Sequence, residues 1–233
     1  MQRQFLILFS AVGRDYILND NLEQMANQLF EHWFVQFKFP SSNNEMSYND
    51  AIKMSIPANW SATTVSELLG KVPNTLRIQS SEYATNGELP IVDQSSNFIA
   101  GYTNMQDSLL YDEHGYIVFG DHTRVVKYIR FPFARGADGT QIMKSDLKNM
   151  PTELFYQIVK HIDLSNHGYA RHFKFLKESV VIVPDEKTAQ LYANTVIPWY
   201  EEQVNIQIEN RKLVQLRDWL LPMLMNGQAT IED

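Results

Sequence analysis

Hydrophobic residues recur at helical spacing near both ends of the chain. In residues 17–37, and again in residues 199–226, apolar side chains step by three or four positions. Side chains at this spacing share one face of an α-helix, so each segment is predicted to be an amphipathic helix whose apolar stripe needs a packing partner. The predicted stripes are Leu22, Met25, Leu29 and Trp33 in the first helix and Leu213, Leu216, Leu220 and Leu224 in the second.

The two predicted helices also resemble each other. At an offset of 191 residues, five of the 21 positions in residues 17–37 are identical, and every stripe position of the first helix falls on a stripe position of the second. Amphipathic helices can match by chance, so the identities alone are a weak signal. A repeated helix on both sides of one different segment nevertheless indicates one half of a two-fold object.

Between the helices the pattern changes to short runs rich in β-branched and aromatic residues. Strands are predicted at residues 88–93, 115–120, 125–131 and 178–184, and helices at residues 63–70, 150–162 and from about Asp185. Strands and helices do not alternate regularly, which argues against a doubly wound sheet. The predicted fold class is therefore α+β. The predicted division is an N-terminal helix in residues 1–39, one mixed α/β domain in residues 40–195 and a C-terminal helix in residues 196–233.

The distribution of charge changes the picture that the net charge gives. The chain carries a net charge of −7, which by itself argues against nucleic acid as a partner. Residues 121–177, however, hold 10 Lys and Arg against 5 Asp and Glu, whereas the rest of the chain holds 10 against 22. This basic window favours an anionic partner, although a solvated basic surface is an equally simple interpretation.

No sequence motif for catalysis stands out. The chain has no Cys, so thiolate metal sites and disulfides are excluded. The glycine-rich loops that bind nucleotides and the common hydrolase and metalloprotease motifs are also absent. Asp121-His122-Thr123 is better interpreted as a turn than as a catalytic or metal site, and residues 184–187 lack the spacing of a metal-dependent nuclease.

The basic window instead combines residue types that suit DNA recognition. Residues 136–139 form a predicted glycine-rich turn, with Arg124, Lys127, Arg130 and Arg135 as cationic donors around it. Residues 166–174 mix amides, aromatic rings and cations, which can read bases, stack and contact phosphates. Each residue taken singly is more simply a polar surface residue. Taken together they predict DNA contacts by Gln94, His122, Arg124, Arg135, Asp138, Asn166, Tyr169, Arg171 and Lys174.

The N-terminus contains a short apolar run, residues 5–12, that resembles a secretory signal. The run is only eight residues long and Ser10 interrupts it. No run in the chain approaches the ~18 apolar residues of a membrane span. We therefore expect a cytoplasmic protein with no membrane partner.

Several segments, in combination, resemble the specificity (S) subunits of type I restriction–modification enzymes. IPANW at residues 56–60 resembles the entry to the target recognition domains of that family. VFGDHTRVVKYIRFPFARGADGT, HGYARHFKFLKESVVIVP, LEQMANQLFEHWFVQF and LRDWLLPMLMNGQ resemble further family segments. The resemblance covers nearly the whole chain, and the combination is more specific than any one of these motifs.

The resemblance implies a non-catalytic DNA-recognition subunit of bacteria or archaea. Family members usually carry two target recognition domains, each reading half of a bipartite site, joined by helices that pack antiparallel as a coiled coil or helical bundle and dock methyltransferase (M) subunits. This chain has only one such domain. Two copies, or this chain and another half-length subunit, are therefore expected to pair, and a homodimer is expected to read a palindromic site. S-adenosylmethionine, ATP and magnesium are expected on the partner subunits. Restriction (R) subunits are expected to be indirect partners.

Two alternatives remain open on the sequence. The chain can be a truncated S fragment that acts only as a protein-interaction module or as a silent recombination cassette. It can also be a self-contained nuclease or methyltransferase, which would require a catalytic motif that the sequence does not display.

Overall fold

The structure, a computed structural model, describes residues 18–40, 45–168 and 171–225. The apolar run at residues 5–12 lies outside this part. The chain divides into two compact units, one comprising Met1–Gln28 with Ile197–Asp233 and the other Leu29–Val196. No helix of the described residues is long and apolar enough to cross a membrane.

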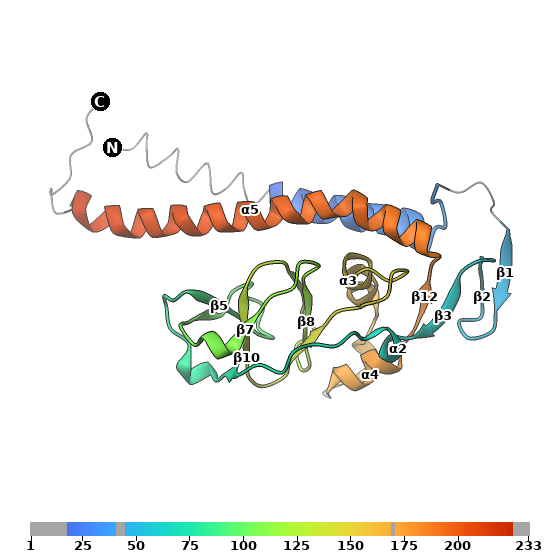
Figure 1. The fold of residues 1–233 in the computed structure, drawn as a ribbon, viewed down its shortest axis with the longest axis horizontal. Helices are drawn as coiled ribbons and strands as arrows, with labels where there is room; N and C mark the ends of the chain where they lie inside the picture. The colour runs from blue at the N-terminus through green and yellow to red at the C-terminus, as the bar shows by residue number, and fades with distance from the viewer. Residues whose placement is uncertain (1–17, 41–44, 169–170, 226–233) are drawn as a thin grey trace, which may run out of the picture. The chain divides into compact units, whose positions relative to one another are not determined.

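The first unit is helical. Residues 18–30 form an α-helix that continues as one π-helical turn, η1 (Glu31–Val35), and the C-terminal segment belongs to the 40-residue helix α5 (Glu186–Met225), continuous in Figure 1. Within the unit, the Gln203 side-chain amide donates to the Asn19 carbonyl oxygen over 3.0 Å, and Ala26 and Ile206 are buried. The two helices are thus in direct contact.

Only part of the predicted apolar stripes is covered. Trp33 is buried and its ring lies 6.1 Å from the Tyr192 ring of α5, whereas Met25 and Leu216 are each 44% exposed. Leu22, Leu29, Leu213 and Leu220 are half-buried, and the side chain of Leu224 lies outside the described residues. Further along α5, Trp219 is 59% exposed. Much of this apolar surface is available for a partner.

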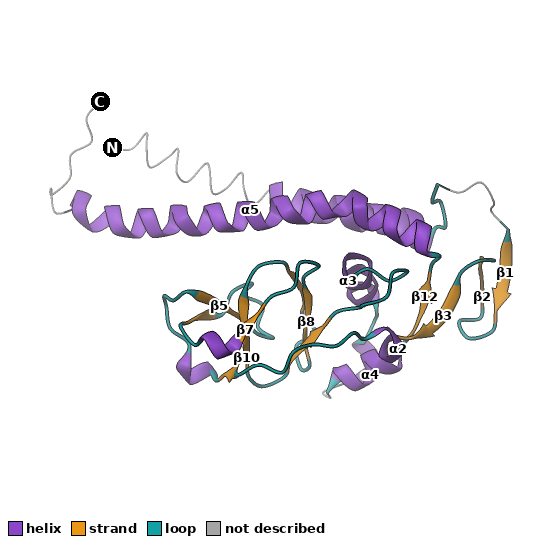
Figure 2. Cartoon of the chain, in the orientation of Figure 1, coloured by secondary structure: helices purple, strands orange, loops and turns teal. Residues whose placement is uncertain are grey.

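The second unit contains two principal sheets, and Figures 1 and 2 label strands β5, β7, β8 and β10 among them. The two sheets share an apolar core. The larger sheet has the order β4-β10-β5-β6, with β7 paired to β10, and the smaller has the order β11-β8-β9. Core residues from both sheets form one cluster, which includes Val92, Phe133, Val118 and Ile129. Two-stranded sheets β1-β2 and β12-β3 complete the unit. The strands are β1 (Met46–Asn49), β2 (Met54–Pro57), β3 (Ser61–Thr64), β4 (Arg77–Ile78), β5 (Leu89–Val92), β6 (Gly101–Thr103), β7 (Leu109–Leu110), β8 (Tyr116–Gly120), β9 (Val126–Ile129), β10 (Phe133–Gly136), β11 (Thr140–Met143) and β12 (Val180–Val183).

Helices of the second unit pack against these strands. On α3, Tyr156 stacks on Tyr128 of β9 with ring centroids 5.3 Å apart, so this helix covers the smaller sheet. Helix α4 follows, and Asp185 precedes the first turn of α5. The helices are α2 (Val65–Leu68), α3 (Thr152–His161) and α4 (His172–Glu178), with 3-10 turns η2 (Ser80–Glu82), η3 (Gln106–Ser108) and η4 (Ser165–His167).

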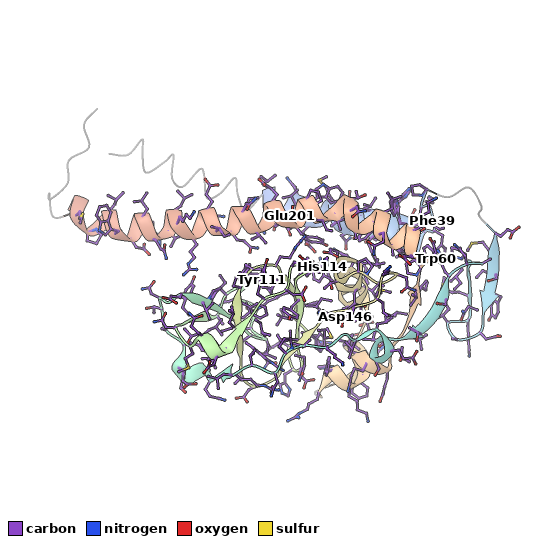
Figure 3. The ribbon with its side chains drawn as sticks, in the orientation of Figure 1. Phe39, Trp60, Tyr111, His114, Asp146 and Glu201 are labelled. Atoms are coloured by element: carbon purple, nitrogen blue, oxygen red, sulfur yellow. The ribbon has the colours of Figure 1, made fainter. Side chains whose placement is uncertain are left out.

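An aromatic cluster joins residues near the start of the second unit to Tyr192 near its end. Trp60 stacks on Phe39 with ring centroids 4.8 Å apart and lies 5.5 Å from Phe34, which in turn packs against Tyr192 (Figure 3). The indole N–H of Trp60 donates to the Asp185 carboxylate over 3.0 Å. Burial by itself raises the pKa of Asp185, but hydrogen bonds from Thr188 and Trp60 outweigh burial and hold the pKa below its ordinary value.

The mixed α+β class is confirmed, whereas one predicted helix is not a separate element. The helix expected from about Asp185 is the first turn of α5, which runs without interruption through Pro198 and Pro222. The predicted glycine-rich turn does not follow β9 directly, because β10 lies between them. The packing of the flanking helices as a coiled coil or bundle stays a prediction.

Candidate nucleic-acid interface

The turn between β8 and β9 contains the sequence GDHTR, residues 120–124. Gly120 begins the turn, its N–H donating to the Val125 carbonyl and its carbonyl accepting from the Arg124 N–H, each over 2.8 Å. The side chains of His122, Thr123 and Arg124 are exposed, while Asp121 is buried. Arg124 adopts φ +62°, a left-handed conformation that costs an ordinary residue about 1 kcal/mol or more.

Gln94 joins this turn to the glycine-rich turn at residues 137–139. Its Oε1 accepts the His122 N–H over 3.2 Å, its Nε2 donates to the Asp138 carbonyl over 2.9 Å, and its backbone carbonyl accepts the Thr123 hydroxyl over 2.6 Å. Gly139 lies so close that an added Cβ would be 2.6 Å from the Gln94 amide, and its φ of +72° favours glycine. Both polar atoms of the Gln94 side chain are thus engaged within the protein.

Asp121 joins the same turn to helix α4. Its N–H donates to the Gly139 carbonyl over 2.7 Å, its carbonyl accepts the His172 N–H over 2.9 Å, and its carboxylate accepts the Phe173 N–H over 2.8 Å. The carboxylate therefore satisfies a backbone donor at the start of α4, as an N-cap side chain does, although it comes from 52 positions away. Three loops and one helix end form a single hydrogen-bonded frame.

Arg135 and Asp138 have different environments within this frame. The Arg135 guanidinium is half-buried and donates through Nε and Nη2 to the Thr140 carbonyl, which braces the turn between β10 and β11. Asp138 is exposed at the tip of that turn and has φ +54°. Only four described non-glycine residues have positive φ, and two of them, Arg124 and Asp138, lie on this frame. Strained residues concentrate at functional sites, which makes this frame a candidate.

The structure brings most of the predicted contact residues to this frame. His122, Arg124, Asp138, Arg171 and Lys174 are exposed on its two turns and on or beside α4, and Asn166 is exposed in η4 of the preceding loop. Tyr169 lies outside the described residues. Gln94 and Arg135 serve the frame itself, so the role that we assign to them is positioning the exposed residues.

Two further cations of the basic window are internal. Lys127 is 5% exposed and donates to the carbonyl oxygens of Asp93 and Asn97, which brackets the loop that carries Gln94. Burial lowers its pKa to about 8, against a smaller opposite effect of Asp93. Arg130, with a side chain 11% exposed, donates to the Glu113 carbonyl and lies 4.0 Å from Glu153. Lys127 and Arg130, predicted as cationic donors around the glycine-rich turn, instead bind acceptors of their own fold.

Among residues 18–40, 45–168 and 171–225, no group of three or more His, Asp or Glu is arranged to hold a metal ion. Asp185 lies in residues 184–187, whose residue types resemble those of a nuclease motif. Its carboxylate accepts hydrogen bonds from the Trp60 indole and from Thr188 in the first turn of α5. The frame presents exposed cations on a backbone that hydrogen bonds hold in place, an arrangement that suits contacts to phosphates and base edges.

Comparison with known proteins points in the same direction. The chain is 26% identical over 237 residues to the Type I restriction enzyme MjaIX specificity subunit of Methanocaldococcus jannaschii, covering 92% of this chain and 54% of that protein. The chain thus resembles a type I restriction enzyme specificity subunit over most of its own length. It spans about half the length of that specificity subunit. No protein-family model matches the sequence.

One solved specificity subunit shares the fold. The crystal structure of the S subunit of a type I restriction–modification system from M. genitalium aligns with a TM-score of 0.55 and 16% identity, over 94% of this chain and 56% of that one. The HsdS subunit from Thermoanaerobacter tengcongensis aligns over 98% of this chain at 9% identity, with a TM-score of only 0.40. The signal for the specificity-subunit homologue was already present in the IPANW and HGYARHFKF segments.

Proposed function

We propose that this chain is a non-catalytic DNA-recognition subunit that reads one half of a bipartite site and directs methyltransferase subunits to it. The observation that carries the proposal is the hydrogen-bonded frame built on Gln94 and Asp121. It holds exposed polar residues of two turns and of the start of α4 in one place, and these include the cations Arg124, Arg171 and Lys174. The homologous specificity subunit supports the same role by its name.

An ordered frame matters because sequence discrimination depends on geometry. A bidentate contact of Arg to guanine contributes about 1–3 kcal/mol of discrimination, and it does so only when the guanidinium reaches the base edge correctly. The Arg124 backbone is fixed by its bond to Gly120, and Arg171 directly precedes a helix whose first N–H groups are bound by Asp121. These two arginines are therefore our candidates for base contacts.

Pairing with a second copy would complete the bipartite recognition. The exposed apolar residues of α5, which include Ile208, Leu216 and Trp219, offer a helical surface for a partner chain. Two copies related by a two-fold axis would present two identical recognition domains and would read a palindromic bipartite site. Methyltransferase subunits, which would supply S-adenosylmethionine, and restriction subunits, which would supply ATP and magnesium chemistry, would complete the complex in the cytoplasm.

A genome-wide map of methylated bases tests the function directly. The map is made in cells that carry the methyltransferase subunit, with and without this chain. A bipartite motif that is methylated only when the chain is present is the expected result, and a palindromic motif is expected from a homodimer. Identical maps would contradict recognition and favour the second candidate, a truncated S fragment that only binds its partners through the apolar face of α5.

Replacing Arg124 or Arg171 with alanine is expected to weaken binding to the recognised sequence by about 1–3 kcal/mol, roughly 5- to 150-fold, and to relax the choice of base at one position. Lys174→Ala is expected instead to weaken all sequences alike, because a phosphate contact carries no sequence information. Titrations of duplexes with each base changed in turn measure both effects. Equal losses on specific and random DNA for both arginine variants would refute their reading role. Lys187→Ala, an exposed cation of α5, is the matched control.

A further inference from the structure

Arg77 is an exposed cation that lies outside the basic window of residues 121–177. It begins β4, a two-residue strand at the edge of the larger sheet. β4 pairs in parallel with β10, and the register sets Arg77 directly beside Arg135. Side chains of directly paired residues lie on the same face of a sheet, so the two guanidinium groups are neighbours.

The positive charges of Arg77 and Arg135 lie close together, and no acidic side chain is paired with either of them in the described part of the chain. Burial, together with a smaller effect of the neighbouring Arg77 charge, lowers the pKa of Arg135 to about 10. Among the residues that the structure describes, no carboxylate forms an ion pair with either arginine, and no hydrogen bond fixes the Arg77 guanidinium. Two adjacent positive charges without a counter-charge concentrate positive potential, which an anion would relieve.

The pair is continuous with the recognition frame. Arg135 donates to the carbonyl of Thr140, which directly follows Gly139, and the carbonyl of Gly139 accepts the N–H of Asp121. The turn that carries Asp138 is also bound to β4, because the Ala137 N–H donates to the Ile78 carbonyl over 2.7 Å. Arg77 is thus attached through β4 to the same turn that presents Asp138.

We propose that Arg77, supported by Arg135, binds a backbone phosphate of the DNA at the edge of the recognition frame. Arg135 is the positioning residue, since its guanidinium is engaged by Thr140, and exposed Arg77 makes the contact. Arginine suits this task because its guanidinium can donate two parallel hydrogen bonds to phosphate oxygens. The proposal rests on the proposed function and extends it to a fourth segment of the chain.

The salt dependence of binding tests the proposal. The full chain, reconstituted with its methyltransferase subunit, is titrated with specific and random duplexes between about 0.05 and 0.2 M salt. Each phosphate contact contributes about one unit to the slope of log K against log salt. Arg77→Ala is expected to reduce the slope of log K against log salt by about 0.9 and to weaken both duplexes about fivefold near 0.15 M salt. Arg77→Lys, which keeps the charge, is expected to restore most of the slope.

Charge removal on the DNA identifies the phosphate. Duplexes with one neutral methylphosphonate at each position in turn are expected to reveal a position that weakens the wild type but has no further effect on Arg77→Ala. An unchanged slope for Arg77→Ala, a slope lowered equally by Lys187→Ala, or no such position would overturn the proposal while recognition by the frame stands. Failure of the wild type to distinguish specific from random DNA would instead overturn the proposed function.

Discussion

Gln94→Ala is expected to weaken binding to the recognised DNA sequence about tenfold or more while binding to random DNA changes little. The substitution removes the bonds from the Gln94 amide to the His122 N–H and the Asp138 carbonyl. Each bond contributes about 0.5–1.5 kcal/mol, and 1.4 kcal/mol corresponds to a factor of ten. Because these bonds join the two turns, their loss should loosen the connection and leave mainly the bond from the Asp121 N–H to the Gly139 carbonyl. Titrations of both duplexes measure the change.

Amide hydrogen exchange distinguishes positioning from direct contact by Gln94. The Asp121 N–H is bonded to Gly139 and not to Gln94, so it reports on the frame as a whole. Its exchange in the free protein should become faster in Gln94→Ala. Unchanged exchange at Asp121, together with relaxed choice of a single base, would contradict the positioning role and indicate that Gln94 reads a base itself. Asn97→Ala, an exposed amide of the same loop, serves as the control.

Trp60→Ala is expected to lower the free energy of unfolding of the recognition unit by about 3–5 kcal/mol. The indole is 5% exposed and packs against Phe34, Phe37 and Phe39. Its removal leaves a cavity among these rings and deprives the Asp185 carboxylate of a donor. Urea unfolding followed by far-ultraviolet circular dichroism measures the loss without relying on tryptophan fluorescence.

Trp60→Phe separates the two contributions. Phenylalanine retains a stacked ring but cannot donate to Asp185, so this variant should lose about 1–3 kcal/mol, the range for a hydrogen bond to a charged group. Tyr111→Ala is the control, because Tyr111 is 58% exposed in the same unit and should change stability by less than about 0.5 kcal/mol. A loss for Trp60→Ala no larger than that of Tyr111→Ala would show that the cluster does not hold the unit together.

Local sequence pattern predicted the elements that are long or strongly apolar. Strands β5, β8, β9 and β12 and helix α3 all fall within predicted segments, because β-branched runs and a helical apolar face are visible in the sequence itself. Strands such as β4 and β7 are two residues long, too short for any periodicity. The full length of α5 was also missed, since Pro198 ordinarily marks the end of a helix.

Residue types predicted the site better than residue roles. Arg124, Arg171 and Lys174 are exposed as expected, whereas Gln94, Lys127 and Arg135 hold the frame through internal hydrogen bonds. The acceptors of Gln94 and Lys127 come from residues about 30 or more positions away, so no local pattern reveals them. Arg77 went unnoticed for the same reason, as its significance comes from its pairing with Arg135.

The bond between Trp60 and Asp185 also bears on how the protein is synthesised. The two residues are 125 positions apart, and β3 likewise pairs with β12 from the far end of the unit. At translation rates of about 5–20 residues per second, Trp60 and its strand wait about 6–25 s before their partners leave the ribosome. During that interval an apolar ring and a strand edge are open to non-native association. Yield in the cell should therefore be sensitive to the speed of translation between these two residues.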